Sequence, residues 1–352
     1  MDKKQVKIFN LLLLLFILPI LISCSSVTYE KVYPILRDGK YDSEFPYSGS
    51  SAELNEISKT VQRINSTGFY RTYVFAPTSK VTIDDILKSS VEKMAFESGL
   101  SDQSSSGTAT TIYHFGGKVA LLTCAHVVNY PDTIISFMSD AEGNLTNYVE
   151  TMLIKENQVI YAAGFPEGSD LDILAIDEKL DVAIIGRDYP TKRNYFFPVF
   201  NYPIGKAKDL EWGTFVYVFG FPMNFQMITK AIVSSPDYDG EGSFLLDAVV
   251  NKGSSGSIIL AIKDGVPNFE LVGIVRKAPI ELNDIIVPPK KQSNEPYNLF
   301  LPYKVQLYVS RNSEIKYGIT KVVSIESILK FIDNNKAELL NREFYLENFL
   351  NK

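Results

Sequence analysis

Short apolar runs rich in β-branched residues fill the chain between about residues 106 and 276, and they constrain its fold more than any other feature. The runs are too short for helices, and glycine, proline and asparagine separate them. They lie at residues 119–122, 182–185, 215–218, 244–246, 257–262 and 271–275. This pattern predicts a mainly β domain.

Composition excludes several other classes of protein. The chain has 352 residues, of which 45% are apolar and 22% charged, so it is neither disordered, collagen-like nor a coiled coil. Its 35 Lys and Arg face 41 Asp and Glu, which gives a net charge of −6. Because no basic cluster with interleaved aromatic residues is present, we expect no nucleic-acid binding.

Helical patterns flank the β region on both sides. Apolar spacing predicts a helix over residues 53–64, a strand follows at 70–75, and Thr82-Ile83-Asp84-Asp85 is typical of a helix start that leads into 86–95. A strand at 303–309 and a helical pattern over 322–350 end the chain. We therefore expect a linker at 24–51, an N-terminal α/β extension at 52–99, a β domain at 100–285 and a largely helical C-terminal extension at 286–352.

The N-terminus has the pattern of a secretory signal peptide at residues 1–23. Lys3, Lys4 and Lys7 precede an apolar run at 11–22, which is too short to span a bilayer as a helix. The following Leu21-Ile22-Ser23-Cys24 resembles the lipobox of bacterial lipoproteins. The resemblance implies cleavage before Cys24, lipidation of its thiol, and an exported chain tethered to a cell-envelope membrane. The alternative is a plain signal anchor with a chance cysteine at its end.

Three motifs follow one another in the β region. In Leu121-Leu122-Thr123-Cys124-Ala125-His126-Val127-Val128 a strand delivers His126 to its end, after a Gly116-Gly117 turn. In Asp181-Val182-Ala183-Ile184-Ile185 a carboxylate stands at the mouth of a buried strand, where it can fix the tautomer of an imidazole; Asp172, which precedes Ile173-Leu174-Ala175, competes for this role. The third motif is Asn251-Lys252-Gly253-Ser254-Ser255-Gly256-Ser257, preceded by Asp247-Ala248-Val249-Val250.

Together the motifs resemble trypsin-like serine proteases, and more narrowly the HtrA/DegP-type protease domain, over about residues 105–277. The resemblance implies a chymotrypsin fold of two six-stranded β-barrels. It also implies that Ser255 is the nucleophile, His126 its base and Asp181 the orienting acid, with the N–H groups of Gly253 and Ser255 as the oxyanion hole. Such a site needs no metal and no cofactor.

The resemblance carries an expectation of specificity as well. Val249, six residues before Ser255, holds the position that lines the base of the primary specificity pocket. An apolar base favours small or medium apolar side chains. We therefore expect a membrane-anchored serine endopeptidase that acts on proteins or peptides. The C-terminal 70 or so residues are too short for the PDZ domain of HtrA/DegP-type proteases.

The sequence also departs from the family pattern. Ser254 replaces the usual Asp or Asn, Ser257 replaces Gly, and Ile258 stands where many members have Pro or an apolar residue. The interval of 55 residues between His126 and Asp181 implies an inserted loop around 139–168. These departures favour an alternative: a catalytically inactive lipoprotein that uses the fold as a binding module. We expect Cys124 to be a buried structural residue rather than a nucleophile, and His114 to be an ordinary strand or loop residue.

Overall fold

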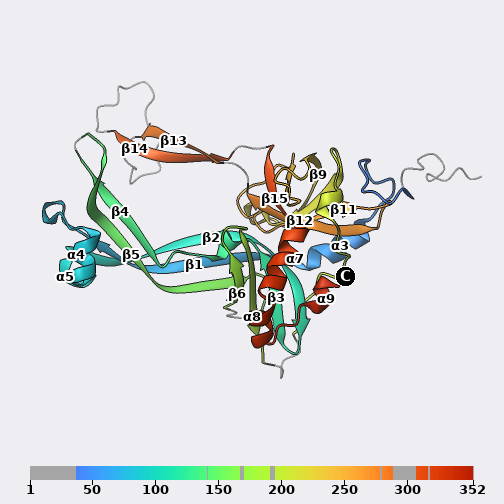
Figure 1. Ribbon diagram of the computed structural model, residues 1–352, viewed down its shortest axis with the longest axis horizontal. Helices are drawn as coiled ribbons and strands as arrows, with labels where there is room; N and C mark the ends of the chain where they lie inside the picture. Colours follow the sequence, from blue (N-terminus) through green and yellow to red (C-terminus); the bar gives the residue numbers. More distant parts are fainter. Residues whose placement is uncertain are drawn as a thin grey trace, which may run out of the picture.

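The computed structural model describes residues 37–140, 142–166, 170–190, 195–277, 280–287, 307–315 and 318–351. Two β-sheets dominate these residues, one open and curled and the other closed into a barrel (Figure 1). The signal peptide and Cys24 lie outside the described residues, as does the first part of the predicted linker. No helix among the described residues is long and apolar enough to cross a membrane.

The curled sheet has seven strands in the order β4-β5-β1-β2-β3-β7-β6. Its strands are β1 (Val61–Val74), β2 (Glu97–Phe115), β3 (Lys118–Thr123), β4 (Thr133–Ser139), β5 (Leu145–Ala162), β6 (Asp172–Asp177) and β7 (Val182–Asp188). The long strands β1, β2 and β5 extend well beyond the rest and, with β4, form an arm (Figure 1). The insertion expected at 139–168 is thus mainly strand β5, which pairs with β4 and β1.

The far end of the arm has a small apolar core of its own. It contains Tyr73, Phe75, Val81, Ile86, Val91 and Val149. Helices α4 (Ile83–Lys88) and α5 (Val91–Met94) cover it. The predicted helix start is confirmed, because the Thr82 hydroxyl accepts from the Asp85 N–H while the Asp85 carboxylate accepts from the Thr82 N–H at 3.0 Å.

The second sheet is a closed barrel of six strands in the order β10-β15-β12-β11-β8-β9. They are β8 (Phe215–Gly220), β9 (Met227–Ser235), β10 (Phe244–Leu246), β11 (Ile258–Ile262), β12 (Phe269–Lys277) and β15 (Thr320–Ser324). Phe215, Phe219, Phe244 and Phe269 are fully buried. Burial of each such ring contributes about 1.5–3 kcal/mol, so the barrel is held by its apolar interior.

The mainly β, chymotrypsin-like architecture is therefore confirmed, with the first barrel realised as a curled seven-stranded sheet rather than as six closed strands. The second barrel also extends beyond residue 285, where the predicted β domain ends, because β15 pairs with β10 and β12. Between β12 and β15 the hairpin β13 (Ile280–Val287) and β14 (Tyr308–Ile315) leads away from the barrel (Figure 1).

Short helices complete the structure. Helix α7 (Ile325–Asn334) follows β15 directly, and its apolar face, with Ile325, Ile328, Phe331 and Ile332, is buried. Helices α8 (Lys336–Asn341) and α9 (Glu347–Leu350) come next. Helix α6 (Ala125–Val128) and the 3-10 turns Pro77–Ser79, Ala207–Asp209 and Pro222–Asn224 lie in loops.

Two N-terminal expectations need correction. The helix predicted over 53–64 is α3 (Ser51–Lys59), and Val61 and Ile64 belong to strand β1. Pairing with β2 and β5 outweighs the helical spacing of these β-branched residues. Part of the predicted linker also packs on the barrel: the Asp42 N–H donates to the Ile262 carbonyl at 2.9 Å, and the Phe215 N–H donates to the Asp42 carbonyl at 2.8 Å.

Candidate active site

His126, Asp181 and Ser255 come together between the two sheets, and we call these three residues the triad. His126 lies in α6, the single turn that follows β3. Asp181 ends the turn between β6 and β7, and Ser255 lies in residues 251–257, the serine loop, which leads into β11. The curled sheet thus supplies two of the side chains and the barrel supplies the third.

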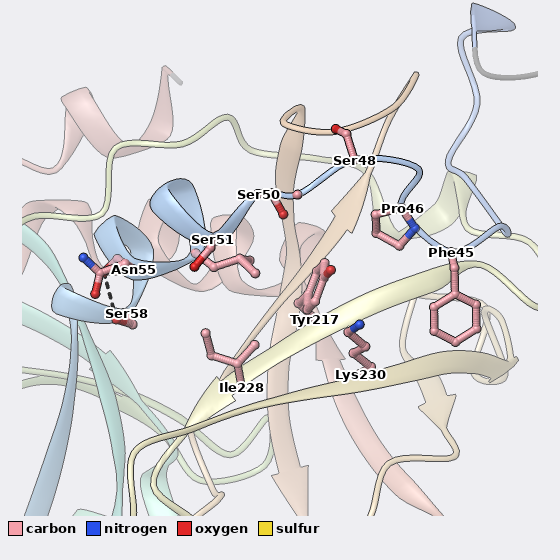
Figure 2. Close-up of a pocket in the computed structure, with 12 residues that line it drawn as sticks. Phe45, Pro46, Ser48, Ser50, Ser51, Asn55, Ser58, Tyr217, Ile228 and Lys230 are labelled. Atoms are coloured by element: carbon pink, nitrogen blue, oxygen red, sulfur yellow. Dashed lines mark hydrogen bonds between the residues drawn. The ribbon is translucent and has the colours of Figure 1, made fainter. Parts of the chain in front are cut away.

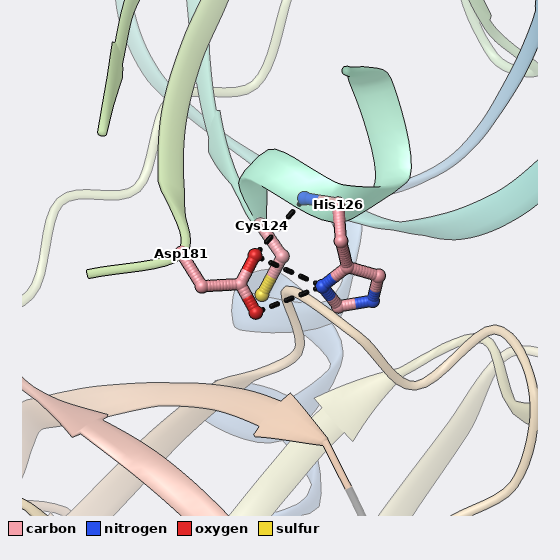
Figure 3. A group of neighbouring side chains, drawn as sticks. All are labelled: Cys124, His126 and Asp181. Carbon is pink, nitrogen blue, oxygen red and sulfur yellow. Dashed lines mark hydrogen bonds and ion pairs between the residues drawn. The ribbon is translucent and has the colours of Figure 1, made fainter. Parts of the chain in front are cut away.

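The triad is linked by hydrogen bonds (Figure 3 shows the His126–Asp181 part). The His126 Nδ1 lies 2.9 and 2.8 Å from the two carboxylate oxygens of Asp181, and its Nε2 lies 2.9 Å from the Ser255 Oγ. An ionised carboxylate only accepts, so the Nδ1 carries the proton. The Nε2 of the neutral ring then accepts from the Ser255 hydroxyl, as a general base must.

Asp181 is held as a carboxylate. It is nearly buried, and burial alone would raise its pKa, but hydrogen bonds from the His126 side chain and N–H, together with the charges of His126 and Arg276, bring its pKa below the ordinary value. The competing Asp172 is exposed at the start of β6, where it pairs with Gly186. Of the two carboxylates, it is therefore Asp181 that lies against the imidazole.

The serine loop depends on two glycines. Gly253 and Gly256 have φ values of +96° and +87°, in the region that side chains disfavour. A Cβ at Gly253 would also collide with the Phe221 carbonyl, and one at Gly256 with the Thr108 carbonyl. Both positions therefore require glycine, in line with the motif.

Strand β2 holds this loop through Thr108, a residue that the sequence alone did not single out. The Thr108 hydroxyl donates to the Gly253 carbonyl at 2.7 Å and accepts from the Phe221 N–H at 3.0 Å. Its backbone N–H donates to the Ser255 carbonyl at 2.8 Å, and the Thr123 hydroxyl donates to the Thr108 carbonyl at 2.7 Å. Every polar group of Thr108 thus fixes the loop or is itself fixed.

The Gly253 and Ser255 amides of the serine loop are left without acceptors. The Lys252 carbonyl turns away to accept from the Met223 N–H at 2.8 Å, and the Ser254 N–H donates to the Asn251 carbonyl at 3.0 Å. Within the described part of the chain, neither the Gly253 N–H nor the Ser255 N–H has a hydrogen-bond acceptor. These are the two donors expected to form the oxyanion hole.

The unusual serines of the loop fit their surroundings. The buried Ser254 places its Oγ 3.3 Å from the Asn251 N–H as an acceptor. The buried Ser257 directs its hydroxyl toward the Thr108 Oγ1 at 3.4 Å, in the space that Gly220 leaves open. Ile258 is fully buried in β11. The departures from the family pattern are thus accommodated without disturbing Ser255.

Cys124 lies beside the triad but faces the barrel. It is fully buried, its Sγ donates to the Val275 carbonyl at 3.2 Å, and burial together with the Asp181 charge raises the pKa of the thiol. Cys124, His126 and Asp181 offer possible metal ligands within 4.8 Å of one another (Figure 3). A protonated thiol and an Nδ1–H that donates to Asp181 are a poor donor set for a metal.

A cavity of about 600 Å³ opens beside Ser255 and His126. Met223, Val250 and Val275 give its wall an apolar part, and Lys252 and Lys277 are its lysines. No acidic side chain of the described residues lines it. Val249, the expected base of the specificity pocket, is 59% exposed and is not among the lining residues, whereas its buried neighbour Val250 is.

Another cavity, of about 510 Å³, lies between segment 45–58 and strands β8 and β9 (Figure 2). The rings of Phe45 and Tyr217 and the amino group of Lys230 line it together with serine hydroxyls. Of the described residues that line it, none belongs to the triad. The contacts of His114 also lie outside the triad. Its ring packs edge-on against the Phe197 ring, with 5.0 Å between the ring centroids, and burial lowers its pKa.

The sheets and the triad define a chymotrypsin-like protease architecture, and comparison with known proteins agrees. The family model of the trypsin-like peptidase domain matches residues 107–274. This chain therefore contains a trypsin-like protease domain.

That domain is related to the HtrA type. The serine proteases HTRA1A and HTRA1B of Danio rerio are each 34% identical to this chain over 115 residues. The match covers 30% of this chain and 22% of each relative, so the chain spans only about a fifth of the length of these proteins.

Proposed function

We propose that this protein is a serine endopeptidase in which Ser255 is the nucleophile. The observation that carries the proposal is the continuous set of hydrogen bonds from Ser255 through His126 to Asp181, with 2.9 Å between the Ser255 Oγ and the His126 Nε2. A serine hydroxyl is a weak nucleophile unless a base takes its proton. His126 is placed to do so, and Asp181 is placed to stabilise the imidazolium that results.

The proposed reaction is acyl transfer in two stages. The Ser255 Oγ attacks the peptide carbonyl while its proton passes to the His126 Nε2, and the negative oxygen of the tetrahedral intermediate binds the N–H groups of Gly253 and Ser255. His126 then gives the proton to the leaving amine, and water hydrolyses the acyl-enzyme by the same route. The absence of an internal acceptor for these two N–H groups, among the described residues, supports this role.

We further propose cleavage after small or medium apolar side chains. The apolar part of the cavity wall, with Val250 and Val275, supports this preference. Lys252 and Lys277 line the same cavity and would repel a cationic side chain. Peptides that differ only at the residue before the scissile bond test it: Val or Ala there should give a higher kcat/KM than Lys or Arg, and the reverse order would refute it.

The peptidase proposal is tested by hydrolysis of an unfolded protein such as reduced, alkylated casein. We expect cleavage by the wild type and none by Ser255→Ala or His126→Ala. Ser254→Ala is the matched control, since it removes the neighbouring hydroxyl and keeps the triad. A well-folded wild type without activity would instead favour a binding module built on the same fold.

We also propose that the chain is an exported lipoprotein anchored through Cys24 to a cell-envelope membrane. The support is the sequence of residues 1–24, with basic residues, an apolar run and Leu21-Ile22-Ser23-Cys24. Expression in a bacterial host with labelled palmitate should label the wild type and leave Cys24→Ala unlabelled. Equal labelling of both would refute the anchor.

A further inference from the structure

Arg276 links the barrel to the turn that carries Asp181. It lies near the end of β12, and its Nε is 3.5 Å from the Asp181 Oδ2. Its Nη2 donates to the Lys179 carbonyl at 2.9 Å. Asp181 and Lys179 both belong to the turn between β6 and β7, so a single guanidinium contacts the carboxylate of the triad and the backbone that presents it.

This contact is shielded from water. The Arg276 side chain is 30% exposed and that of Asp181 is 8% exposed. The Arg276 Nε itself is buried and makes no hydrogen bond to the described residues, so its interaction with the Asp181 carboxylate is an ion pair. In such surroundings the attraction between the two charges exceeds that of an exposed ion pair.

The turn that carries Asp181 has a strained backbone. Asp181 has a φ of +66°, a left-handed conformation that is strained for a non-glycine residue. Within the turn, the Asp181 N–H donates to the Asp177 carbonyl and the Leu180 N–H donates to the Asp177 carboxylate, both at 2.8 Å. These local bonds lie within the turn, whereas Arg276 connects the turn to the barrel.

Other charged groups surround this contact. A cavity of about 400 Å³ lies beside Arg276. It is lined by Asp177 at the end of β6, Lys179 from the turn, Tyr238, Asp239 and Glu241 from the loop after β9, and Lys330 from α7. On the triad side are the neutral Cys124 thiol, the His126 ring and, next along the chain, Lys277. Among Arg276 and the lysines named here, Arg276 is the residue that forms an ion pair with Asp181.

We propose that Arg276 is a positioning residue that acts through Asp181. It holds the carboxylate and its turn against the barrel, and it competes with the His126 imidazolium for the charge of Asp181. Protonated His126 is thereby less stabilised, and the range in which the ring is a free base extends to lower pH. The kinetic consequence rests on the proposed peptidase function, whereas the effect on the His126 ring does not.

The kinetic test compares kcat and KM between pH 5 and 9 for the wild type, Arg276→Met, Arg276→Gln and Arg276→Lys. The neutral variants should lose activity on the acidic side at a pH about half a unit to one unit higher than the wild type. Their kcat at the optimum should fall up to about tenfold with little change in KM. Arg276→Lys keeps the charge and should restore the wild-type acidic limb.

A second readout is independent of activity. In a Ser255→Ala background, the C–H signals of the His126 ring are followed by NMR as the pH changes, with His114→Asn to assign the two histidines. The midpoint should rise by about half a unit to one unit in the neutral Arg276 variants. Lys330→Met, which removes a charge from the same cavity without a contact to Asp181, should leave the midpoint unchanged.

The outcomes separate the two proposals. An inactive wild type refutes the peptidase function, and the NMR titration still decides the role of Arg276. Equal midpoints in wild type and folded Arg276→Gln, or an equal shift in Lys330→Met, would overturn that role. Because the neutral variants keep a long side chain, we expect them to fold, and thermal unfolding checks this. If they do not fold, the kcat of Arg276→Lys decides: a value below that of the wild type supports the positioning role, and an equal value overturns it.

Discussion

The Thr108 hydroxyl of strand β2 donates a hydrogen bond of 2.7 Å to the Gly253 carbonyl in the serine loop. The bond crosses from one sheet to the other and fixes the peptide that follows Gly253. Since the same hydroxyl accepts from the Phe221 N–H, one side chain satisfies two buried backbone groups next to Ser255. The conformation of the serine loop is therefore determined in part by the opposite sheet.

Thr108→Val should lower both stability and activity. The change leaves the Gly253 carbonyl and the Phe221 N–H unpaired, which costs about 1–3 kcal/mol, and we expect kcat/KM to fall about tenfold as the loop shifts. Thr110→Val is the matched control, two residues along the same strand, because the Thr110 hydroxyl is buried without a hydrogen-bond partner in the described structure. Urea unfolding and peptide hydrolysis of both variants provide the measurement, and equal effects would contradict the role of Thr108.

Gly253→Ala should abolish most of the activity. The φ of +96° and the collision with the Phe221 carbonyl force the peptide to move, so one oxyanion donor is displaced. Loss of one such donor lowers kcat by about 10²–10³-fold. Gly213→Ala has a similar φ of +84° with open space around it, so it controls for backbone strain and should keep full activity. Retained activity in Gly253→Ala would argue against this oxyanion hole.

Cys124 should be dispensable for the chemistry. Its thiol is fully buried and its pKa is raised, so little reactive thiolate forms at neutral pH. We expect iodoacetamide to leave the folded protein unmodified at this position and Cys124→Ala to keep most of its activity, with a small loss of stability. Inactivation by iodoacetamide together with an inactive Cys124→Ala would point to a cysteine nucleophile instead.

Asp42 should make the protein less stable as the pH rises through the weakly acidic range. Burial, and to a lesser extent the neighbouring carboxylates, raises its pKa from an ordinary value of 3.8 to about 6, against a hydrogen bond from the Gly265 N–H. Between these values the folded chain binds more protons than the unfolded chain, so the free energy of unfolding falls with rising pH, by about 3 kcal/mol at most.

Asp42→Asn removes this charge and keeps an oxygen to accept from Gly265. The variant should match the wild type near pH 3.5 and exceed its free energy of unfolding by about 1–3 kcal/mol at pH 7. Urea unfolding at the two pH values gives the comparison. The same difference at both pH values would show that titration of Asp42 is not its cause.

The sequence predicted the triad as a set because each member sits in a motif with a fixed local purpose. His126 follows a strand, Asp181 precedes one, and Ser255 lies between glycines that no other residue can replace. Strand alternation and turn chemistry are local, so these positions follow from neighbours in the chain. That they meet in space was an implication of the family resemblance, and the hydrogen bonds now give its geometry.

What the sequence did not predict depends on contacts between distant segments. Thr108 looks like any β-branched strand residue until the serine loop packs on it, and Arg276 looks like the polar end of an apolar run until Asp181 lies beside it. Val61 and Ile64 have helical spacing, yet strand pairing decides their structure. Strand β15 closes the barrel from beyond the hairpin β13–β14, a connection that no local pattern reveals.

The most direct test of the account is labelling of the purified protein with a fluorophosphonate probe, followed by mass spectrometry to locate the adduct. The probe reacts with a serine whose base and oxyanion hole are assembled. The account predicts one adduct on Ser255 in the wild type and in Ser254→Ala, and none in Ser255→Ala or His126→Ala. A folded wild type that remains unlabelled, or an adduct that persists in Ser255→Ala, would contradict it.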